Sequence, residues 1–192
     1  HIRVAERQED IFATRIVKAD LVLGCDIVVA ASDDVVEKMR EGDTRAVINS
    51  CVTPTSDFAT NPDLNLSAET MIDGIESLLA AGDADFVPSS DIATRLMGND
   101  VAGNMFLVGY AMQKGWLPVG LQAVSRAIEL NGVSVEMNKR SLCWGRLAAV
   151  DLATVLSAAA PATSGPTVDT PQQATLATLI EQRCAELVEY QN

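Results

Sequence analysis

Two short apolar stretches joined by a helical segment constrain the fold of this chain most. Residues 19–24, "ADLVLG", and 44–50, "TRAVINS", are rich in apolar and β-branched side chains, and each predicts a buried strand. Residues 26–42 between them predict a mainly helical segment that ends at Gly42. A strand, a helix and a strand with short links form a βαβ unit, so we expect a parallel sheet with a right-handed crossover.

The rest of the chain predicts one more strand and then mainly helices. Residues 68–81 predict a helix that starts at Ser67, and 84–89, "ADFVPS", a short third strand. Beyond Ser90 the predicted helices are 90–97, 100–114, 119–130 and 133–159. We therefore expect an α/β fold, a three-layer α/β/α arrangement with a small, mainly parallel sheet, followed by a helix-rich C-terminal half.

The composition also predicts a domain boundary near the C-terminus. Residues 160–170, "APATSGPTVDT", predict a linker, and a final amphipathic helix follows with Thr170 as its N-cap. We expect one domain over 1–160 and a linker with a helix over 161–192. The chain begins without Met and without the opening strand and Gly-rich turn usual in α/β sheets, so we expect it to be part of a longer protein.

Charge and cysteine usage narrow the classes of function. The formal net charge of −12 argues against a nucleic-acid partner, because binding phosphates requires clustered Lys and Arg. Apolar runs such as 105–112 fall short of the roughly 20 residues that cross a bilayer, so we expect no membrane partner. The four cysteines form no C-x-x-C pair and His1 is the single histidine, so we expect no metal site and no catalytic triad. Reduced thiols and the absence of a visible signal peptide predict a cytoplasmic chain.

The loop after the second strand holds candidates for a substrate cleft. Ligands of open α/β sheets bind beyond the carboxyl ends of the strands, where Asn49, Ser50, Thr53 and Thr55 are expected to lie. The alternative is an ordinary turn, in which short polar side chains serve the backbone, and this is the more common case. Cys51 in the same loop has no histidine to act as its base, so we expect no catalytic residue here.

Two asparagines on predicted helices complete the candidates. Asn104 lies in an apolar run, so we expect a buried amide that ties its helix to a neighbour or reaches a cavity. Asn138 shares one predicted helical face with Ser134, Ser141 and Gly145. Such a face of small and polar residues either lines a cleft or lets another backbone approach closely, and we favour packing.

Other conspicuous side chains are interpreted as structural. Met137, Trp144 and Leu147 form an apolar stripe, which is typical of packing rather than of a cofactor site. The acidic pairs at 33–34 and within 83–85 fall in predicted turns or helix starts. We therefore expect them to be solvated caps and not acid–base catalysts.

Four blocks of sequence resemble one family. They are "ADLVLGCDIVVAAS", "TRAVINSCVTPTSDF", "LMGNDVAGNMFLVGYAMQKGWLPV" and "AIELNGVSVEMNKRSLCWGR". In this order they resemble the gamma-type domain of the 2-oxoacid:ferredoxin oxidoreductases, in particular the indolepyruvate branch of that family. The resemblance covers residues 1–150, and the last two blocks are its most specific part.

The resemblance implies a function for the parent enzyme. Such enzymes oxidatively decarboxylate a 2-oxoacid, here an aryl one such as indolepyruvate, to an acyl-coenzyme A. Thiamine diphosphate with Mg²⁺ forms the carbanion, and iron–sulfur clusters pass electrons to ferredoxin. Other domains of the family hold these cofactors, and the chain has neither a G-D-G…N-N motif nor a cysteine set for a cluster. The resemblance thus implies a partial gamma-type domain that is inactive alone, binds no cofactor itself and has the remaining domains and, through them, ferredoxin as partners.

Two other interpretations stay open at this point. One is a free-standing α/β protein that binds a nucleotide or coenzyme A, although the chain contains no G-x-G-x-x-G and no P-loop. The other is an oligomerisation module that uses the amphipathic final helix. Under the interpretation as a partial domain, a piece cut from a larger assembly exposes an apolar patch that its partners normally cover, so we expect a homo-oligomer.

Overall fold

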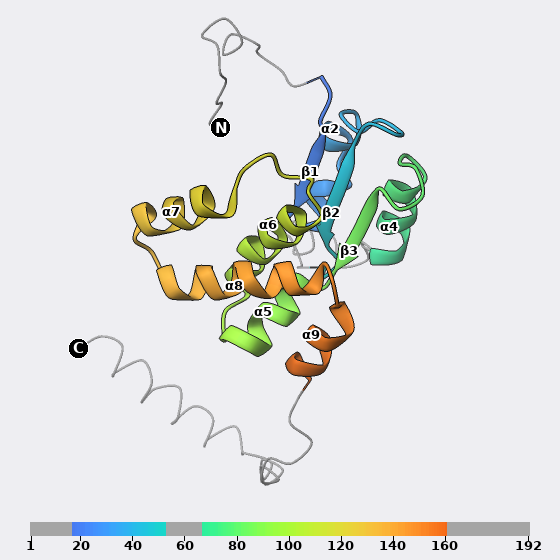
Figure 1. Cartoon of the computed structure of the whole chain (residues 1–192). Coiled ribbons are helices and arrows are strands. Elements are labelled where there is room, and N and C mark those ends of the chain that lie inside the picture. The colour runs from blue at the N-terminus through green and yellow to red at the C-terminus, as the bar shows by residue number, and fades with distance from the viewer. Residues whose placement is uncertain (1–16, 53–66, 161–192) are drawn as a thin grey trace, which may run out of the picture. The chain divides into compact units, whose positions relative to one another are not determined.

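Three short parallel strands form the centre of the structure (Figure 1). The computed structural model describes residues 17–52 and 67–160. Strands β1 (Leu21–Gly24), β2 (Arg45–Asn49) and β3 (Ala84–Val87) lie in the order β1-β2-β3. Both pairs are parallel, which confirms the expected strands and their direction. The described residues thus form a mixed α/β fold.

The strands bury side chains on both faces of the sheet. Successive residues of a strand point to opposite faces, so Val47 of β2 lies on one face and Ala46 and Ile48 lie on the other. What we call the first core consists of Val47, Val87, Ile92, Phe106, Leu107, Tyr110, Ala111, Ala148 and Val155. The second core consists of Ile27, Ala30, Met39, Ala46, Ile48, Ile75 and Leu79. Continuous apolar strands such as 46–48 are what burial on both faces requires.

The crossover between β1 and β2 is not the single helix expected over 26–42. It contains two short helices, α1 (Ile27–Ala30) and α2 (Asp33–Val36). Asp26 starts α1 by accepting a hydrogen bond from the backbone N–H of Val28 at 2.8 Å. Ser32 adopts an extended backbone and begins α2, which breaks the helical run. Gly42 lies in a separate turn with a φ of +74° and does not end either helix.

Helix α4 (Ala68–Glu76) joins the second core through Ile75. It begins at the expected cap, where the Ser67 hydroxyl accepts a hydrogen bond from the backbone N–H of Thr70 at 3.4 Å. The helix ends at Glu76 and not at residue 81, because the chain turns at 77–79 to bring Leu79 into the same core.

The C-terminal half consists of helices on the side of the first core. They are α5 (Ser89–Met97), the 3₁₀ turn η2 (Asp100–Ala102), α6 (Gly103–Gln113), α7 (Leu121–Asn131), α8 (Val135–Ala148) and α9 (Leu152–Ala159). The expected continuous helix over 133–159 is therefore wrong. Asp151 caps a new helix by accepting hydrogen bonds from the N–H of Thr154 at 3.0 Å and from its hydroxyl at 2.6 Å.

Helix α7 lies at the left of the molecule in Figure 1, away from the sheet and next to the start of α8. Its buried residue is Ile128, and Leu121 and Leu130 are exposed. By its internal contacts the chain divides into His1–Ala160 and Pro161–Asn192, and every described residue belongs to the first unit. The expected linker and final helix lie outside the described residues. Within 17–52 and 67–160, each helix falls short of the length and hydropathy needed to span a membrane.

Candidate functional site

The carboxyl ends of the three strands meet at one edge of the sheet, where a ligand of an α/β protein is expected. The register places Gly24 beside Ile48, and Asn49 beside Val87. The loops that leave β1, β2 and β3 therefore start next to one another. Asn49 lies among them with 2% of its surface exposed.

The Asn49 side chain uses its full hydrogen-bonding capacity within the protein. Its Nδ2 donates to the carbonyl oxygen of Cys25 at 3.2 Å and to Oγ of Ser90 at 2.8 Å. Its Oδ1 accepts from the backbone N–H of Cys51 at 3.3 Å and of Ser90 at 3.4 Å. A side-chain amide has two donors and two acceptor positions. Asn49 therefore ties the three loops together and has no free group for a ligand.

The other loop candidates add little to this edge. The backbone N–H of Ser50 donates to the carbonyl oxygen of Val87 at 3.0 Å, which continues the pairing of β2 with β3. Thr53 and Thr55 lie outside the described residues. The partner that the sequence analysis missed is Ser90, which follows β3 in "VPSS". Two serines one residue after the end of a strand are a visible signal of a polar edge.

Two free thiols, those of Cys25 and Cys51, lie near this edge of the sheet. Partial burial, followed by the negative charge of Asp26, raises the pKa of Cys25, and burial raises the pKa of Cys51. A thiol acts as a nucleophile or metal ligand through its thiolate, which these shifts disfavour. Among residues 17–52 and 67–160, no cluster of His, Cys, Asp and Glu could hold a metal ion.

Asn104 and Asn138 do not contribute to the same place. Asn104 is exposed in the first turn of α6, so the expectation of a buried amide is wrong. Asn138 donates from Nδ2 to the carbonyl oxygen of Val133 at 3.0 Å, which closes the start of α8. None of the described hydrogen bonds joins either residue to Asn49. The sequence candidates therefore do not form one cleft.

The face of small residues packs against α6 through its second half. Ser141 is buried and donates to the carbonyl oxygen of Ala102 at 2.5 Å. A Cβ added at Gly145 would lie 1.9 Å from the carbonyl oxygen of Phe106. A Cβ at Gly109 of α6 would lie 2.1 Å from the carbonyl oxygen of Leu142. Each helix thus provides one glycine where the other backbone comes closest.

The first half of that face serves the start of α8. Ser134 precedes the helix with a φ of +46°, and its carbonyl oxygen accepts from the N–H of Asn138 at 2.9 Å. The face therefore combines a helix start with a packing contact. Nothing along it opens into a cleft among the described cavities.

The acidic residues around β3 differ from the expected solvated caps. Asp83 pairs with Arg45, and Asp85 pairs with Lys114 at 3.0 Å. These carboxylates are mostly buried because they lie on the same face of the sheet as Val47, beneath the end of α6. Burial, with a further contribution from Asp85, raises the pKa of Tyr110 to about 12.

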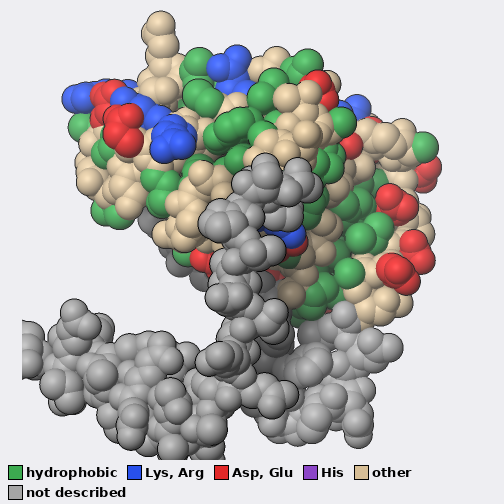
Figure 2. All heavy atoms as spheres, turned by 90° about the horizontal axis from the view of Figure 1, so that it is seen from below, with side chains coloured by type: hydrophobic (Ala, Val, Ile, Leu, Met, Phe, Trp, Pro, Cys, Tyr) green, Lys and Arg blue, Asp and Glu red, His purple; other side chains and the backbone are tan. Residues whose placement is uncertain are grey.

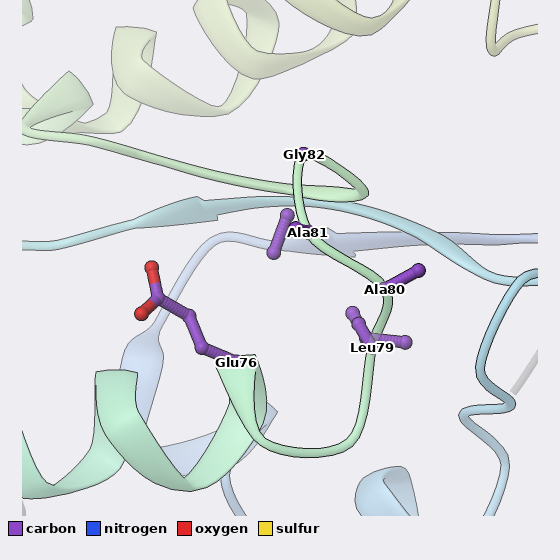
Figure 3. A pocket seen from close by; sticks show the side chains of 6 residues that line it. Glu76, Leu79, Ala80, Ala81 and Gly82 are labelled. Atoms are coloured by element: carbon purple, nitrogen blue, oxygen red, sulfur yellow. The ribbon is translucent and has the colours of Figure 1, made fainter.

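One cavity of about 370 Å³ lies at the opposite edge of the sheet. Figure 3 shows Glu76 at the end of α4 beside the loop that carries Leu79, Ala80, Ala81 and Gly82. The loop leads into the amino end of β3. Ligands of parallel sheets bind at the other edge, and Glu76 alone among the lining side chains is ionisable. This cavity has no set of groups that could carry out a reaction.

A second cavity of about 360 Å³ lies on the surface of α8. It is lined by Lys139, Arg140, Cys143, Trp144 and Leu147, and we call it the α8 groove. Trp144 also packs against the first core, so the floor of the groove is anchored in the domain. The lining combines apolar contact area with positive charge, which suits binding of a partner more than catalysis.

Comparisons of the chain with models of known families, with curated proteins and with solved structures give no match in any of the three. The family resemblance of the four sequence blocks therefore stays an expectation.

Proposed function

We propose that this chain is a structural domain of a thiamine diphosphate-dependent 2-oxoacid:ferredoxin oxidoreductase. The parent enzyme would convert an aryl 2-oxoacid such as indolepyruvate to its acyl-coenzyme A in the cytoplasm. Thiamine diphosphate, Mg²⁺ and iron–sulfur clusters would be held by its other domains. The chain would supply the later part of a three-layer α/β/α domain of the gamma type.

The main support for a structural role comes from the edge of the sheet at which the carboxyl ends of the strands meet. A binding crevice in a parallel sheet forms where the strand order reverses, and β1, β2 and β3 follow one another in chain order. The loops at their carboxyl ends are held together by Asn49, whose hydrogen bonds are all internal. This favours a domain that positions others over one that binds a nucleotide or coenzyme A here.

The family resemblance is concentrated on two helices that meet closely. The third sequence block contains α6 with Gly109, and the fourth contains most of α8 with Gly145. Both glycines lie where a Cβ would overlap the backbone of the other helix. Small residues at these two positions are a requirement of the fold. The two most specific blocks thus support a helix packing shared with the family. The oxidoreductase chemistry of the parent enzyme is inferred from that likeness.

The coding sequence around this segment tests the proposal directly. We expect a thiamine-binding region with a G-D-G…N-N motif and clustered cysteines in the same or an adjacent reading frame. The purified chain, supplied with indolepyruvate, thiamine diphosphate, Mg²⁺ and coenzyme A, should not reduce a viologen dye. The intact enzyme from the same locus is the positive control. Turnover by the chain alone, or a locus that encodes it as a complete separate protein, would refute the proposal.

Exposed apolar side chains outside the α8 groove favour a second candidate function, an oligomerisation module. Leu121 and Leu130 of α7 are exposed, and self-association would cover them. Sedimentation velocity over a range of concentrations distinguishes this function. A strictly monomeric chain at high concentration would exclude it.

A further inference from the structure

The outer face of α8 is a continuous, unpartnered stripe of the described surface. Arg140, Cys143 and Leu147 follow one another at the spacing of a helical face, Val150 comes just after the end of the helix, and all four are exposed. The exposed fraction is 41% for Leu147 and 72% for Val150. The opposite face of the helix is buried against α6, so the stripe is held rigidly.

The charge of this region is opposite to that of the rest of the chain. Helices α7 and α8 contain four basic and two acidic residues: Arg126, Lys139, Arg140, Arg146, Glu129 and Glu136. The other described residues contain six basic and fifteen acidic ones. In Figure 2 several Lys and Arg side chains lie at the left edge, the side of α7 and α8, with a few acidic ones among them, and acidic side chains gather at the right edge.

The basic side chains differ in their availability to a partner. Lys139 is paired with Glu129 at 2.8 Å. Arg146 donates to the side-chain oxygen of Gln113 at 3.1 Å. Arg140 has no ion pair among the described residues and lines the groove. The guanidinium of Arg140 is therefore free to bind a carboxylate next to the apolar stripe.

We propose that the α8 groove is a docking site for an amphipathic helix of another polypeptide whose apolar stripe is flanked by carboxylates. A helix fits because the groove follows one helix, and side chains of a second helix can pack between its ridges. Acidic flanks fit because Lys139 and Arg140 line the groove and no acidic side chain does. The inference depends only on this surface, so it stands whether or not the proposed function is correct.

A second copy of the chain fits the groove less well. In a symmetric pair of chains that met through this groove, each copy would bring Lys139 and Arg140 and no acidic side chain. Like charges across an interface oppose association. The partner must therefore bring its own negative charge.

Titration of the isotope-labelled full chain with two designed peptides tests the proposal by nuclear magnetic resonance. One peptide is an amphipathic helix with a leucine stripe flanked by glutamates, and the other has every glutamate replaced by lysine. We expect the glutamate peptide to shift the backbone amide signals of α8, and the lysine peptide to leave them unchanged. Higher salt should weaken the binding, because exposed charges are screened.

Two pairs of variants locate the site. Leu147→Asp and Arg140→Glu should each weaken the binding of the glutamate peptide by at least about tenfold. The matched controls are Leu78→Asp, with 39% exposure at Leu78, and Arg95→Glu, at an exposed arginine of α5; both should bind like the parent chain. If Leu147→Asp fails to fold, the exposed Arg140→Glu carries the test alone.

Three results would overturn the proposal. Equal binding of both peptides would mean unspecific apolar adsorption. Signal changes away from α8 would place the site elsewhere. Shifts of α8 signals with protein concentration alone, without any peptide, would show that a second copy covers the groove.

Discussion

Replacing Gly145 by alanine tests the close contact between α6 and α8. The added Cβ would lie 1.9 Å from the carbonyl oxygen of Phe106, whereas real Cβ contacts essentially never fall below 3.0 Å. The atoms in its way belong to the backbone of α6, so no side chain can rotate aside. The two helices must separate by about 1 Å at their crossing, which loosens the packing of the first core on both sides.

The expected cost follows from this displacement. Overpacking of a well-packed interior costs typically 1–3 kcal/mol, and we expect Gly145→Ala to fall near about 3 kcal/mol because backbone is involved. For a chain of this size, each kcal/mol lowers the melting temperature by about 2–4 °C, so the variant should melt about 6–12 °C lower. Thermal and urea unfolding, followed by circular dichroism, measure both quantities.

A second glycine provides the matched control. Gly74 lies within α4, and a Cβ there would meet nothing within 4 Å. Gly74→Ala should stabilise the protein by about 0.4–1 kcal/mol, because alanine loses less backbone entropy in a helix. The same substitution is therefore expected to lower the stability of the protein at Gly145 and to raise it at Gly74. If Gly145→Ala melted at or above the temperature of the parent chain, the reasoning about the helix contact would be wrong.

Three further outcomes are expected. Asn49→Ala should lower the free energy of unfolding by about 3 kcal/mol, because it leaves partly buried hydrogen-bonding groups in three loops without their partner. Hydrogen exchange at the amide of Ser90 should accelerate, and unchanged urea midpoints would contradict this prediction. Because the pKa of Tyr110 is raised to about 12 in the folded state, the stability it contributes is complete below its ordinary value of 10 and is lost as the pH rises through 12; Tyr110→Phe should flatten this decline in urea titrations across that range. Hydrogen bonds from Thr154 lower the pKa of Asp151, so the stability that this carboxylate contributes is present above its ordinary pKa of 3.8 and is lost in acid. Asp151→Ala should therefore lower the melting temperature at neutral pH more than Asp151→Asn does. Equal losses in the two variants would argue against the helix cap.

The strands could be predicted because their signal is local. The runs 21–24 and 46–48 are apolar on both faces of the sheet. The helical segment between them predicts a crossover, and a crossover makes the two strands parallel. The breaks in the predicted helices could not be found from periodicity. On both sides of Ser32 and of Asp151 the apolar spacing is helical. The break shows only in the extended backbone of Ser32 and in the capping hydrogen bond that Asp151 accepts.

The candidate site could be predicted less well, because its contacts join distant parts of the chain. Asn49 was singled out, but its partner Ser90 lies 41 residues further on, so its structural role is not visible in the sequence. The spacing of Ser141 and Gly145 indicated a packing face. The identity of the neighbouring helix, α6, was not predicted, nor was the matching role of Gly109 in it. Both depend on how two helices cross in the tertiary structure.

Strand β2 belongs to both cores, and this has a consequence for how the molecule opens. Helices α1 and α2 are one turn each and cover only the face of Ala46 and Ile48, so they can detach in local openings at low free energy. Such an opening leaves Val47 packed under α6 and leaves both neighbouring strands paired with β2. The amides of β2 therefore become accessible to solvent only when both layers separate, and their exchange reports the global unfolding of the domain.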